Sequence, residues 1–257
     1  MSMSINQHFS PCRLLQFALP SIIMMMFMSL YTIVDGIFIS RFIGSNALSS
    51  LNIVFPVICI VTAIGTMLAT GGNAIISKYL GEGKHREARE CLTMFVVVGV
   101  TVSIVVLVFT HLFLTPVCYF LGSNEVLLAD CEKYLATAIS FAPACMLQSL
   151  FQSYLVTAEK PHLGLYVIIA AGMTNMVLDF LFVGVWGFGL AGAAIATVCG
   201  ELIGGLFPVI YFSRKNSSLL HLGKTHWNGR VFLQTCINGS SELMTNLSSS
   251  IVNSLYN

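Results

Sequence analysis

Long, continuously apolar runs alternate with short polar clusters along the whole chain. The runs cover residues 14–39, 50–79, 91–115, 133–157, 162–186, 189–213 and 230–257. Each is about as long as the roughly 20 apolar residues that a membrane-spanning helix requires, or longer. A transmembrane β-strand would instead alternate apolar and polar residues over about 10 positions. The pattern therefore predicts an all-α polytopic membrane bundle of seven helical segments.

The composition excludes several classes of protein. Hydrophobic residues make up 56% of the 257 residues and charged residues 9%, whereas a typical soluble domain has about 25% charged residues. The net charge of +1 gives no basic surface for nucleic acid. These values exclude an ordinary soluble enzyme, a basic nucleic-acid-binding protein and a disordered chain. The first run lacks a basic start and a small-residue cleavage site, so we expect a retained anchor.

The distribution of Lys and Arg predicts the orientation. With the N-terminus in the cytoplasm, ten of the 12 basic residues lie on the inner side, and only Arg41 and Lys133 lie outside. We therefore expect a cytoplasmic N-terminus (1–13), a six-helix lobe (14–213), a cytoplasmic linker (214–229) and the start of a seventh helix (230–257). Cys118 and Cys131 share an outer loop and could pair; no Cys or His spacing indicates a metal site.

Four acidic residues lie inside the predicted spans without a basic residue at similar depth. They are Asp35, Asp179, Glu201 and Glu242. An ionisable group in the hydrocarbon region costs a few kcal/mol, and such residues commonly mark a functional site. A carboxylate without a cationic partner either carries a proton or binds a cation.

The predicted topology brings two of these acids to one depth. Asp35 lies six residues before Arg41, Asp179 eight before Gly187, and Thr197 eight after Gly189. At about 1.5 Å per residue, all three lie on the order of 10 Å inside the outer boundary. Asn175 shares a helix face with Asp179. Oxygen ligands of this kind suit Na⁺, and the two carboxyls could equally share a proton.

Three further positions have two interpretations each. Glu201 either takes part in cation coupling or is a protonated, hydrogen-bonded acid. Glu242 lies near mid-membrane on a polar helix face, which favours a role in a cavity. Pro20 produces either a static kink in the first span or a bend that changes when a nearby carboxyl changes its protonation.

Several segments carry recognisable motifs: Leu19-Pro20, Val34 to Gly44, Ile76 to Lys84 with Ala88, Phe151 to Tyr154, Ala158 to Tyr166, Asn175 to Asp179 and Gly189 to Thr197. With these segments the chain resembles the multidrug and toxic compound extrusion (MATE) family over nearly its whole length. The combination of Asn-x-x-x-Asp with Gly-x-x-Gly-Ala-Ala-Ile-Ala-Thr is the most specific of them. Within the family, the chain looks like the bacterial multidrug-efflux branch.

The resemblance implies a role for each of these positions. It implies a cation or proton site at Asp35, Asn175, Asp179 and Thr197, a first-helix bend at Pro20, and binding of cations or cationic drugs at Glu242. Two features depart from the family: Glu201 stands where we expect Gln in many relatives, and the chain ends inside the seventh of twelve expected helices. The remaining lobe is expected in the same full-length chain.

We therefore expect half of an antiporter in the bacterial cytoplasmic membrane that exports lipophilic or cationic drugs in exchange for Na⁺ or H⁺. No enzymatic activity, cofactor or nucleic acid is expected. A flippase for lipid-linked sugars or polysaccharides is the first alternative, but the spans lack the basic residues that would bind phosphates. An intramembrane aspartyl protease is the second, but its Tyr-Asp and Gly-x-Gly-Asp motifs are missing.

Overall fold

The computed structural model describes residues 11–214 and 218–256, and these residues form helices and no strands. Most of the predicted N-terminal segment 1–13 and Lys215 fall outside this range. The elements are α1 (Pro11–Phe38), the π-helix η1 (Ile39–Ile43), α2 (Ser45–Gly81), α3 (His85–Leu112), α4 (Leu114–Phe120), α5 (Leu128–Ser140), α6 (Ala142–Thr157), α7 (Pro161–Asp179), the π-helix η2 (Phe180–Val185), α8 (Gly189–Ser213) and α9 (Gly229–Tyr256).

Five stretches of these helices are long and apolar enough to cross a membrane. They are Ala18–Ile43, Asn46–Gly81, His85–Leu112, Pro161–Val185 and Gly189–Ser213. A sixth span is obtained if α5 and α6 are counted together. The seventh predicted segment does form one helix, α9, but this helix is not among the candidate spans because many of its positions are polar.

The apolar run at 133–157, predicted as one helix, is broken. α5 ends at Ser140, α6 begins at Ala142, and the two helices meet at 54°. Pro143 occupies the first turn of α6. A proline has no N–H to continue the hydrogen-bond ladder but is well tolerated in the first turn of a helix, so Pro143 favours the start of a new helix here.

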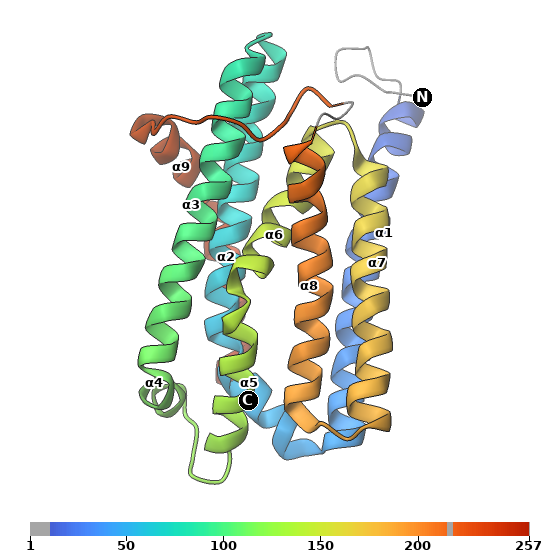
Figure 1. Cartoon of the computed structure of the whole chain (residues 1–257), viewed down its shortest axis with the longest axis vertical. Helices are drawn as coiled ribbons and strands as arrows, with labels where there is room; N and C mark the ends of the chain where they lie inside the picture. Colours follow the sequence, from blue (N-terminus) through green and yellow to red (C-terminus); the bar gives the residue numbers. More distant parts are fainter. Residues whose placement is uncertain (1–10, 215–217, 257) are drawn as a thin grey trace.

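The helices form a bundle with two sides (Figure 1). α1, α7 and α8 stand together on one side, and α2, α3 and α9 stand on the other. The bent pair lies between them, with α6 packed on both α2 and α8. The start of α1 and the connections α2–α3, α6–α7 and α8–α9 all lie at one end, the top of Figure 1. These are the connections that the orientation prediction assigns to the cytoplasm.

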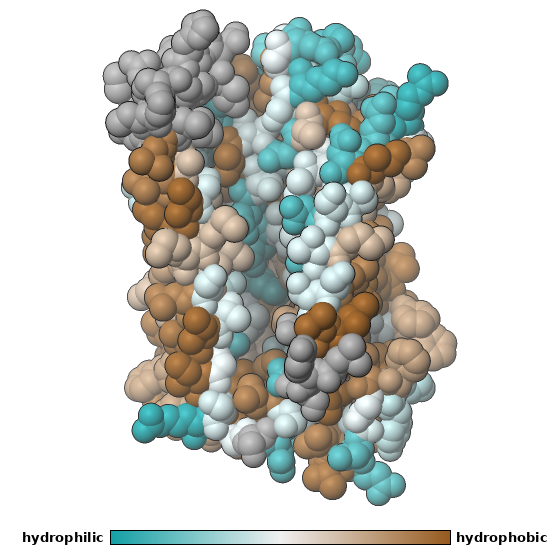
Figure 2. All heavy atoms as spheres, turned by 180° about the vertical axis from the view of Figure 1, so that it is seen from behind, coloured by the Kyte–Doolittle hydropathy of each residue, from teal (hydrophilic) through white to brown (hydrophobic). Residues whose placement is uncertain are grey.

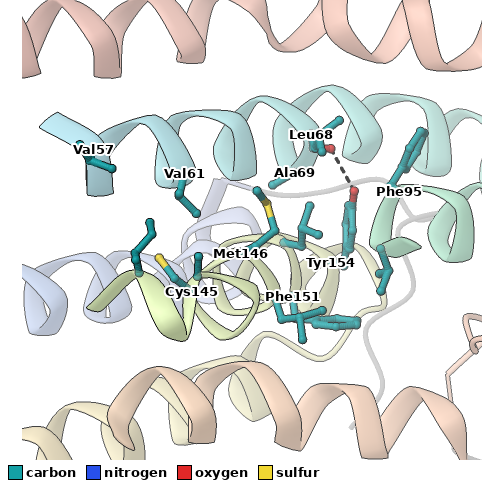
Figure 3. Close-up of a cluster of buried hydrophobic side chains, with 14 of the residues drawn as sticks. Val57, Val61, Leu68, Ala69, Phe95, Cys145, Met146, Phe151 and Tyr154 are labelled. Atoms are coloured by element: carbon teal, nitrogen blue, oxygen red, sulfur yellow. Dashed lines mark hydrogen bonds between the residues drawn. The ribbon is translucent and has the colours of Figure 1, made fainter. Parts of the chain in front are cut away.

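Buried apolar and aromatic side chains pack around α6, against α2, α3 and α8 (Figure 3). Phe95, Phe151 and Tyr154 are completely buried. The hydroxyl of Tyr154 donates a hydrogen bond to the Leu68 carbonyl, 2.9 Å away. A buried tyrosine requires such a partner, because leaving the hydroxyl unpaired in an apolar interior costs free energy. This bond attaches α6 to α2.

α2 and α9 cross at very short range where each carries a glycine. A Cβ placed on Gly71 would lie 2.0 Å from the carbonyl oxygen of Thr235, and one on Gly239 would lie 2.0 Å from that of Met67. Small residues of this kind let membrane helices approach closely. Further along the same pair, the Asn246 amide donates to the Thr66 hydroxyl at 3.1 Å.

Cys118 of α4 and Cys131 of α5 are both fully buried, and both thiols are free. The Cys131 thiol faces the carbonyl of Ser50 at 3.7 Å. The disulfide that the shared loop allows is therefore not formed in this structure.

Candidate functional site

The two acids predicted to share a depth lie on adjacent helices, α1 and α7, which pack against each other. Each helix changes from α to π geometry soon after its acid. η2 begins at Phe180, directly after Asp179, and η1 begins at Ile39, four residues after Asp35. π-Helical turns are rare and occur often at functional sites, because the widened turn alters the direction of the side chains around it.

The carboxyl groups of Asp35 and Asp179 lie within hydrogen-bonding distance of each other. Asp179 has no exposed surface. No protein donor in the described residues reaches Asp35 Oδ1 or either carboxyl oxygen of Asp179. Two facing carboxylates repel each other, so this arrangement requires a proton shared between them or a bound cation.

Asn175 and Thr197 complete the predicted group of four residues. Asn175 is buried, and its side-chain amide donates to the Thr197 hydroxyl at 3.4 Å. That hydroxyl donates in turn to the carbonyl of Ala193 at 3.1 Å. The amide oxygen of Asn175 has no donor within reach in the part of the chain that the structure describes. The structure thus brings together all four predicted residues, with unpartnered oxygens on Asp35, Asn175 and Asp179.

A cavity of about 560 Å³ opens beside these residues, which is the size of a typical small-molecule site. It is lined by Tyr31, Thr32, Asp35, Gly36, Leu48, Leu51, Asn52, Phe55, Ile58, Val61, Tyr134, Ala138, Ile139, Ala142, Cys145, Asn175, Ala194, Thr197, Val198 and Glu201. No Lys, Arg or His is among these lining residues. Figure 2 shows a hollow with hydrophilic residues at its floor, on the face opposite to that of Figure 1.

Glu201 lines the same cavity as Asp35, one helical turn beyond Thr197 on α8. The thiol of Cys145, on α6, is within hydrogen-bonding distance of its carboxylate. Tyr31 also lines this part of the cavity. Sequence reasoning missed both neighbours. Tyr31 lies four residues before Asp35, and this spacing would have placed it on the same helix face.

Glu242 and Pro20 lie away from this group. Glu242 is exposed on α9 and is not among the cavity-lining residues, so the structure does not bring it together with the other three acids. Pro20 is buried inside α1, which continues as one helix from Pro11 to Phe38. Among the described residues there is no group of three or more His, Cys, Asp or Glu that could hold a metal ion.

Comparison with known proteins agrees with this architecture. The sequence profile of the MatE family matches residues 20–181. The multidrug export protein MepA of Staphylococcus saprophyticus is 24% identical over 196 residues, which are 75% of this chain and 44% of that protein. The chain thus spans about half the length of the curated relatives it matches.

Two solved structures share the fold. The crystal structure of MATE in complex with MaD3S superposes with a TM-score of 0.86 at 19% identity, covering 92% of this chain and 54% of that one. A MOP superfamily transporter from Pyrococcus furiosus, whose binding pocket is described as having reversed polarity, superposes with a TM-score of 0.84 at 19% identity over 92% of this chain and 53% of that one. The family match spans more than half of the chain and the whole of the Asp35–Asp179 region. This multi-pass membrane protein belongs to the MatE family.

Proposed function

We propose that this chain forms the N-terminal lobe of a secondary antiporter in the bacterial cytoplasmic membrane, with its N-terminus inside. The carboxyl pair Asp35–Asp179 binds the coupling ion, and the cavity beside it holds the exported compound. The observation that carries the proposal is the pair itself. The two carboxyl groups lie within hydrogen-bonding distance, one of them is fully buried, and no donor among the described residues reaches Asp35 Oδ1 or either oxygen of Asp179.

The chemistry of the pair suits either H⁺ or Na⁺ as the coupling ion. A proton placed between the two carboxyls removes their repulsion and forms one strong hydrogen bond. A Na⁺ ion would be attracted to the same carboxylate oxygens and to the free amide oxygen of Asn175, because hard cations prefer oxygen ligands. In both cases, occupation of the site stabilises the contact between α1 and α7.

The lining of the cavity favours lipophilic cations as the exported compounds. Its walls are mostly apolar, and its two ionisable carboxyls, Asp35 and Glu201, have no basic residue among the lining residues to neutralise them. An ammonium group would supply this missing charge. Ion and drug then compete by stabilising different states of the lobe, which is the thermodynamic requirement for exchange. A second lobe, in the same full-length chain, completes the cavity for alternating access.

The two alternative functions receive less support. A flippase for lipid-linked sugars must hold phosphates, and this acidic cavity would repel them. An aspartyl protease could use a close carboxyl pair, but the chain lacks the motifs of that class and belongs to a family of transporters.

Ethidium efflux from cells that express the native reading frame tests the proposal. Asp35→Asn and Asp179→Asn should each abolish efflux, because the pair can no longer bind and release a cation. Glu125→Gln removes an exposed carboxylate outside the cavity and serves as the control, with efflux expected to be unchanged. Imposed Na⁺ and pH gradients identify the ion. Unchanged efflux in both Asp variants would refute the assignment of these residues.

A further inference from the structure

The segment that follows α8 is attached to the start of α3 by three hydrogen bonds. Arg89 Nε donates to the carbonyl of Leu219 at 2.8 Å. The Gly223 amide donates to the hydroxyl of Thr93 at 3.1 Å, and the Thr225 hydroxyl donates to the carbonyl of Glu90 at 2.7 Å. These bonds join residues 130 to 135 positions apart in the sequence. The part of the linker from Leu219 to Thr225 is therefore fixed across this end of the bundle (Figure 1).

A hollow of about 310 Å³ lies between this linker and α3. Its charged and titratable lining residues are Arg86, Arg89, Glu90, His221, Lys224 and His226. Three permanent positive charges thus face one carboxylate. This is the reverse of the acidic cavity near Asp35, and it is a separate site at one end of the bundle.

The single acid of the hollow does not neutralise all three bases. Glu90 Oε1 accepts a hydrogen bond from Arg86 Nε at 2.9 Å, and its other oxygen lies 4.0 Å from His226 Nδ1. Arg89 uses its Nε to hold the linker backbone. Lys224 is exposed at the hollow. The site therefore keeps an excess of two positive charges, in a geometry that the linker holds in place.

Exposed apolar side chains on the same linker fit a position of the hollow near the lipid head groups. Trp227 is 66% exposed and Leu219 is 51% exposed, although Leu220 between them is completely buried. Exposed Trp is enriched at the membrane–water boundary, where its ring lies among the head groups. Basic residues that only set the orientation of the chain in the membrane need neither a hollow nor a fixed linker. The positive-inside rule therefore does not account for this arrangement.

We propose that this hollow binds the phosphodiester head group of an anionic phospholipid, with phosphatidylglycerol as the simplest example. Arg guanidinium groups match phosphate oxygens through paired, charge-assisted hydrogen bonds. Basic pockets on the cytoplasmic side of helical membrane proteins bind such head groups. The head group stabilises the linker that joins α8 to α9. The site is independent of the proposed coupling function.

Native mass spectrometry of the purified protein in detergent, titrated with phosphatidylglycerol or phosphatidylcholine, tests the site. The variant R86Q/K224Q removes two bases while leaving Arg89 to hold the linker. The control K78Q/K84Q removes two exposed bases at the same end, on the α2–α3 hairpin and outside the hollow. Thermal unfolding of each variant checks that the fold is intact.

Phosphatidylglycerol should bind preferentially, and R86Q/K224Q should weaken its binding about tenfold or more, because two of the three bases that attract the phosphate are removed. The control should change it less than about twofold. Loss of the same size in both variants would show a diffuse surface charge and overturn the proposal. Retention of the lipid preference in R86Q/K224Q would also overturn it, as would complete displacement of the lipid by excess inorganic phosphate.

Discussion

The crossing of α2 and α9 predicts a specific steric effect of adding one methyl group. In Gly71→Ala the new Cβ would lie 2.0 Å from the carbonyl oxygen of Thr235, whereas real Cβ contacts stay above about 3.0 Å. The two backbones must therefore separate by about 1 Å at this point. That movement also strains the hydrogen bond between Asn246 and Thr66.

The size of the effect follows from two opposing terms. Overpacking of a tight contact costs about 1–3 kcal/mol. Replacing a helical glycine by alanine otherwise stabilises a helix by up to about 1 kcal/mol. Gly81→Ala isolates the second term, because nothing lies within 4 Å of the Cβ it would add. We expect Gly71→Ala to be less stable than Gly81→Ala by about 1–3 kcal/mol.

The reciprocal geometry adds a sharper test, which uses Gly239→Ala. Its Cβ would meet the carbonyl of Met67 at the same 2.0 Å, so one separation of the helices relieves both clashes. The double variant should therefore cost little more than either single variant, a coupling of about 0.5–3 kcal/mol. Unfolding in mixed detergent micelles, followed by circular dichroism, measures all four variants. Equal stability of Gly71→Ala and Gly81→Ala, or additive costs in the double variant, would refute the reasoning.

Three further predictions are tested by measuring the free energy of unfolding or the hydrogen exchange of backbone amides. Tyr154→Phe should lower the unfolding free energy by about 0.5–1.5 kcal/mol, because the Leu68 carbonyl loses a buried donor; an unchanged value would contradict this. Gly44→Ala should cost about 1–3 kcal/mol, because Gly44 has φ 112° and ψ 174°, a region open almost only to glycine; Gly36→Ala, with open space around its Cβ, is the control. Burial and Arg89 lower the pKa of His221, so the folded state disfavours its protonated form. Its contribution to stability is present above the unfolded pKa of about 6.5 and is lost as the pH falls below it. Hydrogen exchange of the linker amides, corrected for intrinsic rates, should therefore accelerate from about pH 7.5 to 5.5 in the wild type and less in His221→Gln; identical pH profiles would refute this.

The helical architecture could be predicted from sequence because it depends on length and apolarity alone. Continuous apolar runs admit only helices in a bilayer, where every backbone group must be paired within its own segment. The break at Pro143 was missed because Phe141, Ala142 and their neighbours remain apolar through it. A hydropathy profile does not register that Pro143 lacks a backbone N–H group. The π-turns after Phe38 and Asp179 leave no signal in composition either.

For the candidate site, the depth of each residue in the membrane could be predicted, but the rotation of each helix about its own axis could not. Counting residues from the outer boundary placed Asp35, Asp179 and Thr197 at one level, where the structure brings them together. Counting from Arg230 at the inner boundary placed Glu242 near mid-membrane, and its side chain is exposed on α9. Residue counting gives the height along a helix, whereas the neighbour that a side chain meets depends on how the helices are packed. The contact of Cys145 with Glu201, across two helices, lies beyond such reasoning for the same reason.

The break between α5 and α6 determines how much space this lobe encloses. Tyr134, Ala138 and Ile139 line the large cavity from just before the break, and Ala142 and Cys145 line it from just after. The cavity therefore lies beside the bend, and both α5 and α6 contribute to its wall. A straight helix through these residues would follow a different path past the cavity. The shape of the cavity thus depends on the backbone corner at Pro143, and a substitution of Pro143 would alter that shape without removing any carboxyl group of the site.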